Sequence, residues 1–235
     1  MQSNRVLIFT ATYNEAGNIA EWAHRVHESM PQADILVVDD NSPDGTTGIL
    51  EELSMRFTKL RVINRTGKLG LASAHLLGMK EFRLGNYDAL ITLDADLSHR
   101  PEELPELLSA LSDFDFVIGT RFGEGKNEYK AWRKFLSSGG NLLARTLIPT
   151  GLTEYTTSMR AFRPVAVDAI LDQASHDEGY AFFLESIYDL KKANVTLGEV
   201  PIHFMDRGAG ESKIPRRQIF KSMIVLGKLA CGKRE

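Results

Sequence analysis

Two aspartates with one residue between them, Asp94 and Asp96, directly follow the apolar run Ala89–Leu93. Side chains two residues apart on an extended chain point the same way, so these carboxylates repel each other unless a cation or a proton lies between them. Carboxylates bind hard cations such as Mg²⁺ or Mn²⁺, which complete their shell with water and substrate phosphate. The pair therefore indicates a metal site, although aspartates at an ordinary turn after a strand give the same pattern.

Two further polar residues, Ser98 and His99, follow the aspartates and could add a metal ligand or a supporting hydrogen bond. Pro101 is typical of the first turn of a helix, and the acidic residues after it suit the helix dipole. We therefore interpret His99 as the residue that enters this helix rather than as a metal ligand.

The elements that must position the pair are strands alternating with helices. The predicted strands of the first half are Val6–Thr10, Ile35–Val38, Leu60–Ile63, Ala89–Leu93 and Phe114–Gly119. Their nearly continuous apolar character predicts an α/β fold, a parallel sheet covered by helices on both faces. In the second half we predict helices over Trp132–Leu147 and Glu178–Lys192, and strands over Thr156–Phe162 and Val195–Phe204.

Acidic residues stand at the exits of three predicted strands: Glu15, Asp39 with Asp40, and Asp94 with Asp96. The carboxyl ends of parallel strands share one edge of the sheet, which is where open α/β sheets bind ligands. We therefore expect these side chains to form one site. Five basic residues accompany it in the sequence, namely Arg121, Arg133, Arg160, Arg207 and Lys213. Guanidinium and ammonium groups suit phosphate oxygens, so the combination indicates a bound diphosphate.

Composition sets broad limits on the function. The chain has 235 residues, 43% of them apolar and 25% charged, with a net charge of −3 and one cysteine. These values fit one large globular domain and give no argument for nucleic acid as a partner. The single cysteine excludes an internal disulfide and fits a reducing cytoplasm. We expect neither a signal peptide nor a transmembrane helix, because no apolar stretch has the required pattern.

Several motifs resemble those of the family 2 glycosyltransferases with the GT-A fold. They are Tyr13-Asn14-Glu15, the stretch Val38–Thr46, Asp94-Ala95-Asp96, Lys68–Leu71, Gly119-Thr120-Arg121 and the stretch Pro201–Lys213. The last is more specific to the polyprenyl-phosphate (dolichyl-phosphate) mannosyltransferase branch. The resemblance covers nearly the whole chain and implies a GT-A-type, Rossmann-like, mostly parallel sheet. It also implies inverting, Mg²⁺- or Mn²⁺-dependent transfer of mannose from GDP-mannose to a membrane polyprenyl phosphate.

The resemblance further implies a role for each matching residue. The nucleotide would be held by Ala11, Tyr13, Glu15, Val38, Asp40, Asp94 and Ala95, and the metal by Asp96 and Ser98. Phosphates of donor or acceptor would contact Arg121, Arg207 and Lys213, and the acceptor phosphate would also contact Arg133 and Ser137. On this basis Asp94, Asp96 and Arg121 are the expected catalytic residues.

A polyprenyl acceptor requires contact with a membrane surface. From Lys213 to Arg234 all charged residues are basic and alternate with apolar ones. We expect a glycosyltransferase domain over residues 1–213 and a basic amphipathic segment over 214–235. This segment could be an interfacial helix or a helix packed on the sheet, and a small membrane-anchoring subunit could provide the contact instead. The expected location is the cytoplasm, peripherally on the cytoplasmic face of a membrane.

Three other functions fit parts of the sequence. A glucosyl or other nucleotide sugar could replace GDP-mannose, since no residue identifiable here recognises the hydroxyls of the sugar. A phosphatase of the haloacid dehalogenase type also uses an Asp-x-Asp motif, but normally on its first strand rather than its fourth. A nucleotide-sugar-binding subunit without catalysis is the non-enzymatic alternative, and the intact acidic pair argues against it.

Overall fold

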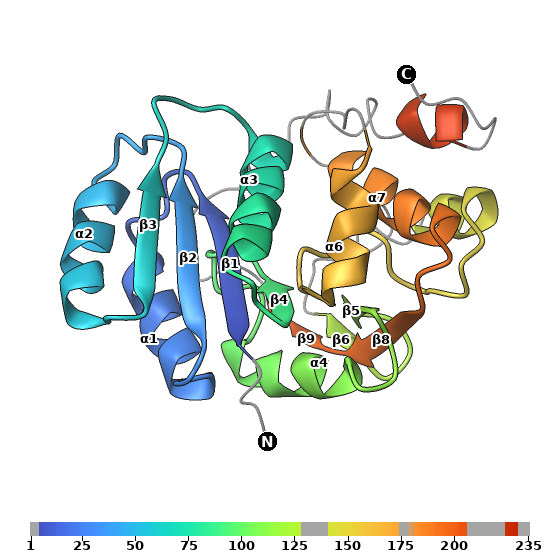
Figure 1. The fold of residues 1–235 in the computed structure, drawn as a ribbon, viewed down its shortest axis with the longest axis horizontal. Helices are drawn as coiled ribbons and strands as arrows, with labels where there is room; N and C mark the ends of the chain where they lie inside the picture. Colours follow the sequence, from blue (N-terminus) through green and yellow to red (C-terminus); the bar gives the residue numbers. More distant parts are fainter. Residues whose placement is uncertain (1–4, 128–140, 174–178, 180, 206–223, 230–235) are drawn as a thin grey trace.

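A seven-stranded sheet organises the protein in this computed structural model, which describes residues 5–127, 141–173, 179, 181–205 and 224–229 (Figure 1). In spatial order its strands are β3 (Leu60–Asn64), β2 (Asp34–Asp39), β1 (Val6–Thr12), β4 (Ala89–Thr92), β7 (Arg160–Phe162), β5 (Phe116–Thr120) and β8 (Leu197–Pro201). The pairs β3–β2, β2–β1, β1–β4 and β5–β8 are parallel. The predicted mostly parallel sheet is therefore present.

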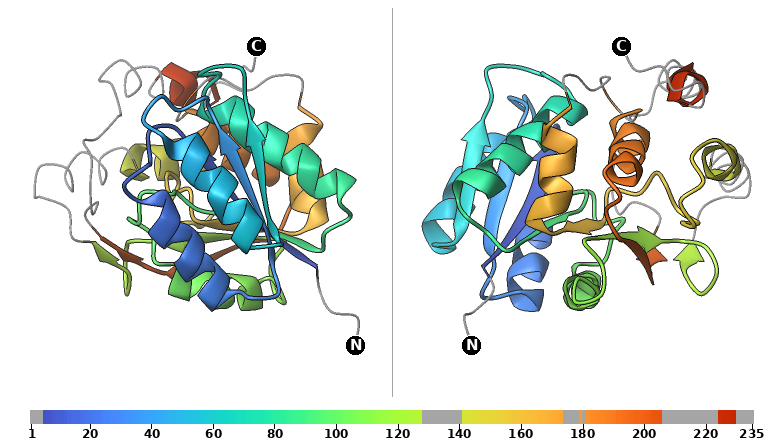
Figure 2. Two further views of the ribbon diagram at one scale, coloured as in Figure 1. Left: turned by 90° about the vertical axis from the view of Figure 1, so that its left-hand side faces the viewer. Right: turned by 45° about the vertical axis from the view of Figure 1, so that its right-hand side comes forward.

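Helices cover both faces of the sheet, and the sheet separates the core into two clusters (Figure 2). One cluster takes its apolar side chains from α1 (Ile19–Ser29), α2 (Thr46–Arg56) and α4 (Leu104–Ala110), which follows the 3₁₀ turn η1 (Pro101–Glu103). The other takes them from α3 (Leu71–Leu84), α6 (Pro164–Leu171) and α7 (Ala181–Lys192). Strand β1 contributes Ile8 to the first cluster and Phe9 to the second, because successive side chains of a strand point to opposite faces.

Three features of the second half differ from the sequence expectations. The predicted strand Thr156–Phe162 is reduced to β7, which runs antiparallel between β4 and β5. Helix α6 was not predicted, although Pro164 stands at its first turn. The predicted strand Val195–Phe204 divides into β8 and a short β9 (His203–Phe204), which pairs with β6 (Lys126–Asn127) in a separate two-stranded sheet. Because β7 is antiparallel, the residues before it lie at the edge where the parallel strands end.

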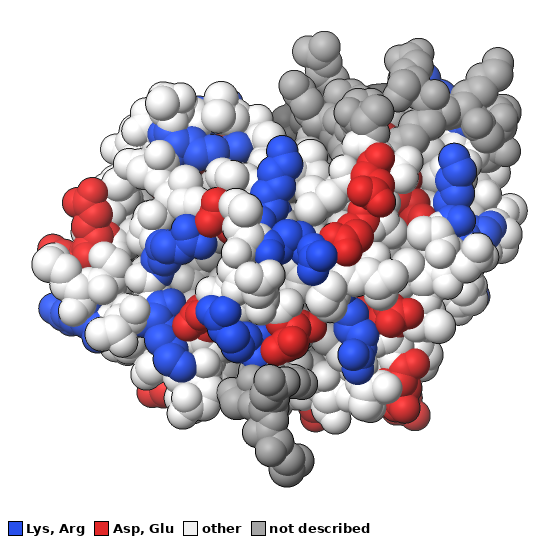
Figure 3. Space-filling model, viewed as in Figure 1, with Lys and Arg blue, Asp and Glu red and all other residues white. Residues whose placement is uncertain are grey.

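The C-terminal segment is described only over residues 224–229, which are helical. Val225, Leu226 and Leu229 are buried in the cluster that contains α7, whereas Ile224 is exposed. These three side chains thus pack against the core, and the choice between a helix packed on the sheet and an interfacial helix stays a prediction for the segment as a whole. Within the described ranges, no helix combines the length and apolar character needed to cross a membrane. On the face shown in Figure 3, basic and acidic side chains are interspersed.

His75 on α3 is a buried histidine surrounded by aromatic rings. The rings of Phe9, Phe182 and Phe183 have centroids 5.1, 5.4 and 5.2 Å from it. Burial, with a smaller contribution from the charge of Arg160, lowers the pKa of His75 to about 3. Its native form is therefore neutral, whereas in the unfolded chain it becomes protonated as the pH falls through about 6.5.

The contribution of neutral His75 to the free energy of unfolding should be complete above pH 6.5, and it should be lost progressively as the pH falls towards 3. The slope from this one proton is at most about 1.4 kcal/mol per pH unit. Urea unfolding at pH 7 and pH 4.5 measures it, and His75→Phe should flatten the dependence between these values. His24→Gln, on an exposed part of α1, is the matched control. An unchanged slope in His75→Phe contradicts the account.

Candidate active site at the carboxyl ends of the strands

The three acidic strand exits lie together, as predicted. Thr12, the last residue of β1, pairs with Asp39 of β2 in parallel register, and Phe9 of the same strand pairs with Thr92 of β4. The residues that follow these strands therefore emerge at one edge of the sheet, towards which β1, β2 and β3 point in Figure 1. This edge brings the 13–15, 39–40 and 94–96 segments into one site.

Each of these exits turns sharply through a residue in the left-handed region. Asn14 has φ 60°, Asn41 has φ 56° and Leu97 has φ 61°. Asparagine adopts this conformation readily, but for leucine it is uncommon and costs about 1 kcal/mol or more. Leu97 lies between Asp96 and Ser98 and is buried. The surrounding packing thus holds the loop after β4 in a strained shape, which is frequent at functional sites.

Asp39 and Asp40 have different surroundings. Asp39 is fully buried and accepts hydrogen bonds from Thr12 Oγ1 at 2.8 Å, Ser42 Oγ at 2.6 Å and Thr47 Oγ1 at 2.8 Å. It therefore closes the turn after β2.

Asp40 instead joins the exit of β2 to the start of α3. It accepts a bond of 2.9 Å from the Gly70 N–H and forms an ion pair with Arg65. Arg65 also donates to the Gly70 carbonyl at 2.9 Å and to Ser73 Oγ at 2.6 Å. Gly70 has φ 96°, a conformation that favours glycine. The contact with Arg65 was not predicted, and it orients the carboxylate assigned to the nucleoside.

Tyr13 is covered by the loop that carries Lys68. The Lys68 ammonium lies 3.9 Å from the centroid of the Tyr13 ring, in cation–π geometry. Glu15 accepts a 2.9 Å bond from Asn18 Nδ2, and its N–H donates to Thr46 Oγ1. Both residues thus lie at the predicted edge, each oriented by a neighbour.

Three residues assigned to the nucleotide have little exposed side-chain surface. Val38 and Ala95 are buried, and Ala11 is partly buried against the core. Val38 is 0% exposed, and the role of all three stays a prediction.

Asp96 is a buried carboxylate held by the loop that carries it. It is 4% exposed, and its Oδ1 accepts hydrogen bonds from Ser98 Oγ at 2.5 Å and from the Ser98 N–H at 3.1 Å. Ser98 therefore orients the Asp96 carboxylate, and its role as a direct metal ligand stays a prediction. Among the described residues no group of three or more acidic, histidine or cysteine side chains is arranged to hold a metal. A cation here would depend on Asp96, with oxygens of substrate and water.

Phe204 connects the loop after β4 to the loop after β5. Its ring meets the His99 ring edge-on, with centroids 5.0 Å apart, and lies 5.1 Å from Cζ of Arg121. The N–H of Met205 donates to the Ser98 carbonyl at 3.0 Å. His99 is 1% exposed, with Nδ1 3.8 Å from a carboxylate oxygen of the more exposed Asp94. The turn η1 begins at Pro101, so His99 precedes the helix as predicted, and its exclusion as a metal ligand stays a prediction.

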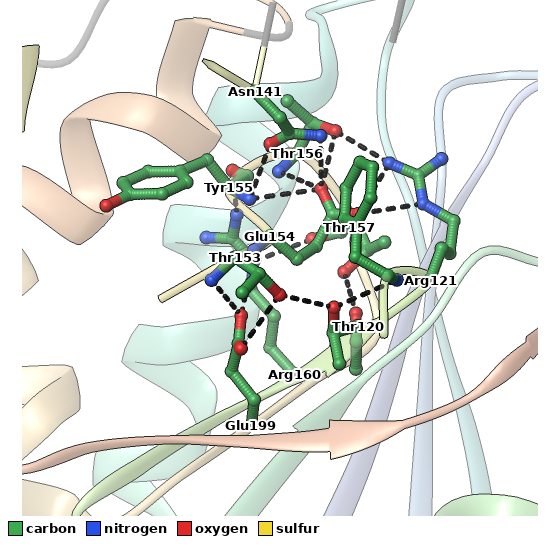
Figure 4. A network of polar contacts seen from close by, with 12 residues as sticks. Thr120, Arg121, Asn141, Thr153, Glu154, Tyr155, Thr156, Thr157, Arg160 and Glu199 are labelled. Atoms are coloured by element: carbon green, nitrogen blue, oxygen red, sulfur yellow. Dashed lines mark hydrogen bonds and ion pairs between the residues drawn. The ribbon is translucent and has the colours of Figure 1, made fainter. Parts of the chain in front are cut away.

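Arg121 follows β5 and is held by a buried carboxylate (Figure 4). Its Nε and Nη2 each lie 2.8 Å from Oε2 of Glu154, and Nη2 also donates to Thr156 Oγ1 at 2.8 Å. Glu154 is 33 residues away in the sequence, in the turn that precedes β7, and no local pattern indicated the pairing. Sequence reasoning therefore missed the residue that fixes the orientation of Arg121.

Arg160 was expected among the basic residues of the site, and this is wrong. It is 1% exposed and donates to the carbonyls of Thr157 at 2.7 Å, Tyr155 at 2.9 Å and Phe183 at 3.2 Å. Its guanidinium belongs to the protein core, not to a phosphate site. The remaining basic residues of the prediction, together with Ser137, lie outside the described residues: Arg133, Arg207 and Lys213.

Comparison with known protein families decides the class. The model of the family described as "Glycosyl transferase family 2" matches residues 7–171. The chain belongs to glycosyl transferase family 2. This confirms the enzyme class expected from the motifs and sets aside the phosphatase alternative.

Two curated relatives refine the position of this glycosyltransferase within its family. An undecaprenyl-phosphate mannosyltransferase from Micrococcus luteus is 36% identical over 212 residues, which cover 89% of this chain and 87% of the relative. A polyprenol monophosphomannose synthase from Mycolicibacterium smegmatis is 36% identical over 225 residues, covering 94% of this chain and 85% of the relative. Both matches extend beyond the family model and include the second half of the chain.

A solved structure supports the fold of this glycosyltransferase. The mannosyltransferase from Pyrobaculum calidifontis, solved in complex with GDP-Man and Mn²⁺, superimposes with a TM-score of 0.67. The match covers 100% of this chain and 66% of the other, at 17% sequence identity. At that identity the similarity establishes the fold alone.

Proposed function

We propose that this glycosyltransferase moves a mannosyl residue from GDP-mannose to the phosphate of a polyprenyl lipid, with inversion at the anomeric carbon. The observation that carries the proposal is the 36% identity, over most of the chain, to two proteins named for polyprenyl-phosphate mannosylation. The strand-exit edge is consistent with it, because it gathers the residues expected for the nucleotide and the metal at one place.

The donor half of the reaction needs a place for a nucleoside diphosphate. Tyr13, Glu15 and Asp40 lie where they could hold the nucleoside, and Arg121 follows β5 at the same edge of the sheet. An oriented carboxylate such as Asp96 suits a hard cation that keeps water and substrate oxygens in its shell. A bound Mg²⁺ or Mn²⁺ supplies Lewis-acid stabilisation of the departing diphosphate.

The acceptor half of the reaction does not need a strong base. A phosphate monoester has a second pKa of about 6 and is largely dianionic near neutral pH. Its oxygen is therefore already a competent nucleophile, and the protein has to orient it and screen its charge. The loops of the site present Arg121, and we expect Arg207 and Lys213 to join it. Such a site suits a phosphate acceptor better than a hydroxyl acceptor, which needs a base to remove its proton.

The lipid acceptor places the reaction at a membrane surface. We infer peripheral association with the cytoplasmic face, through the basic C-terminal segment or through a small anchoring subunit. Binding to vesicles with and without anionic lipid tests the first of these, because basic segments bind anionic surfaces electrostatically.

The donor identity is tested with purified protein, polyprenyl phosphate and labelled GDP-mannose, UDP-glucose or UDP-N-acetylglucosamine, each with Mg²⁺, Mn²⁺ or EDTA. We expect label in the lipid phase from GDP-mannose only, and none with EDTA. Transfer from UDP-glucose alone moves the assignment to a glucosyltransferase. Failure of every donor, in a protein that binds GDP, contradicts the proposed function.

A further inference from the structure

Glu154 lies at the centre of a polar network beside Arg121 and is fully buried (Figure 4). Its two carboxylate oxygens have different partners. Oε2 faces the guanidinium of Arg121, whereas Oε1 accepts hydrogen bonds from Asn141 Nδ2 at 3.1 Å and from the N–H and Oγ1 of Thr156, both at 2.8 Å. One side chain thus joins the loop after β5, the helical residues 141–147 and the turn before β7.

The contacts of Arg121 fix the orientation of its guanidinium. Nε–H and Nη2 form one edge of the planar group, and this edge faces Glu154 and Thr156. The ring of Phe204 lies 5.1 Å from Cζ. Two partners on one edge and a ring against the group restrain its rotation, and the opposite edge carries Nη1.

The turn that carries Glu154 is itself held from two sides. Oε1 of Glu199 on β8 accepts the N–H groups of Thr153 at 2.6 Å and Glu154 at 2.8 Å. Arg160 on β7 donates to the carbonyl of Tyr155 at 2.9 Å. The sheet therefore fixes the backbone of the turn that carries Glu154.

A negative charge at this position has a cost for the proposed reaction. Burial alone would raise the pKa of Glu154, but the charge and hydrogen bonds of Arg121, with those of Thr156, outweigh burial and hold the pKa below its ordinary value. Glu154 is therefore ionised at neutral pH and cancels the charge of Arg121. Because this cancellation of charge weakens the attraction of the site for phosphate, the carboxylate must contribute something other than phosphate affinity.

We propose that Glu154 is a positioning residue for the transfer step: it holds the Arg121 guanidinium in the one orientation in which Arg121 meets a donor phosphate. The proposal rests on the proposed function for the identity of that phosphate. Glu154 acts through Arg121 and touches no substrate itself. Its loss should therefore reduce turnover more than it reduces nucleotide binding.

The alternative is that Glu154 only stabilises its turn, and matched variants separate the two roles. Glu154→Gln removes the charge at constant size. Glu154→Asp keeps the charge but withdraws it by one methylene group. Glu199→Gln removes a charge that supports the same turn through Thr153 and Glu154 without touching Arg121. The measurements are kcat, the KM for the donor, the Kd for GDP by calorimetry, and Tm.

We expect Glu154→Gln to lower kcat about 100-fold, the usual cost of a misplaced catalytic group, with the Kd for GDP within about threefold of the wild type. Glu154→Asp should recover part of this loss. Glu199→Gln should keep kcat within about threefold while it lowers Tm at least as much as Glu154→Gln does. Equal losses of kcat in Glu154→Gln and Glu199→Gln, or a fall in GDP affinity that accounts for the lost turnover, overturns the proposal.

A second measurement does not depend on the reaction. The Arg121 Nε–H signal in ¹H–¹⁵N spectra is assigned by its absence in Arg121→Lys. The exchange of this proton with water should be slow in the wild type. It should accelerate at least about tenfold in Glu154→Gln, because a lost buried hydrogen bond exposes the group, and change little in Glu199→Gln. Unchanged exchange in Glu154→Gln overturns the positioning role even if mannosyl transfer is observed. If the exchange accelerates in Glu154→Gln but the wild type has no transferase activity, the proposed function is refuted and the positioning role is not.

Discussion

Replacing Asp96 with asparagine is expected to lower kcat for mannosyl transfer by about 10²- to 10³-fold, equal to about 3–4 kcal/mol of barrier. The reason is that Asp96 is the buried carboxylate held by Ser98 at the strand-exit edge, and it is the residue best placed to hold a cation. Asparagine keeps the shape and removes the charge. Mn²⁺ binding followed by electron paramagnetic resonance, together with kcat, measures the effect.

Two neighbours provide controls for this prediction. Asp94→Asn should cost less, about tenfold, because its carboxylate is more exposed and we expect it on the nucleotide side. Ser98→Ala removes the hydrogen bond that orients Asp96 and should lower Mn²⁺ affinity about 10- to 100-fold. If Asp96→Asn keeps kcat within about threefold of the wild type, the assignment of Asp96 as a metal ligand is wrong.

Replacing Arg160 with methionine is expected to destabilise the protein by about 3–5 kcal/mol. The guanidinium is fully enclosed, and burial lowers its pKa to about 9 while the charge of Glu154 opposes that shift. At neutral pH it stays charged and satisfies the carbonyls of Tyr155, Thr157 and Phe183. Methionine fills much of the volume but leaves these carbonyls buried without their donor, which is the costly outcome.

The free energy of unfolding in urea measures this loss. Arg163, which stands directly after β7, is exposed and donates from Nε to the Leu111 carbonyl at 2.6 Å. Arg163→Met should therefore cost no more than about 1 kcal/mol, because Arg163 is exposed and its hydrogen bond to Leu111 is not enclosed. Similar losses in Arg160→Met and Arg163→Met contradict the view that Arg160 is the buried support of the turn before β7.

The first half of the fold was accessible from sequence because its signals are local. Each strand from β1 to β5 is a short apolar run, and the helices between them have helical periodicity or a proline at the start. The second half depends on pairing between distant segments. β7 inserts antiparallel between β4 and β5, and nothing in the residues Arg160–Phe162 specifies that position. Helix α6 was missed although Pro164 signals its start.

The same division applies to the site. The acidic residues at strand exits could be predicted, because parallel strands end at one edge. The partners that orient the site residues could not be predicted. Arg65 meets Asp40, and Glu154 meets Arg121, only after the chain has folded. Arg160 shows the converse error: a basic residue near site motifs in the sequence belongs to the core. Residue type indicates which chemistry is possible, and tertiary contacts decide where each charge acts.

The most direct test of the account compares two acceptors, a polyprenyl phosphate and the polyprenol of the same chain length, with labelled GDP-mannose and Mn²⁺. In the proposed reaction an oxygen of a dianionic phosphate is the nucleophile and needs no base. We therefore expect label in the lipid phase with the phosphate acceptor and none with the alcohol. Equal transfer to both lipids, or transfer to the alcohol alone, would contradict this expectation.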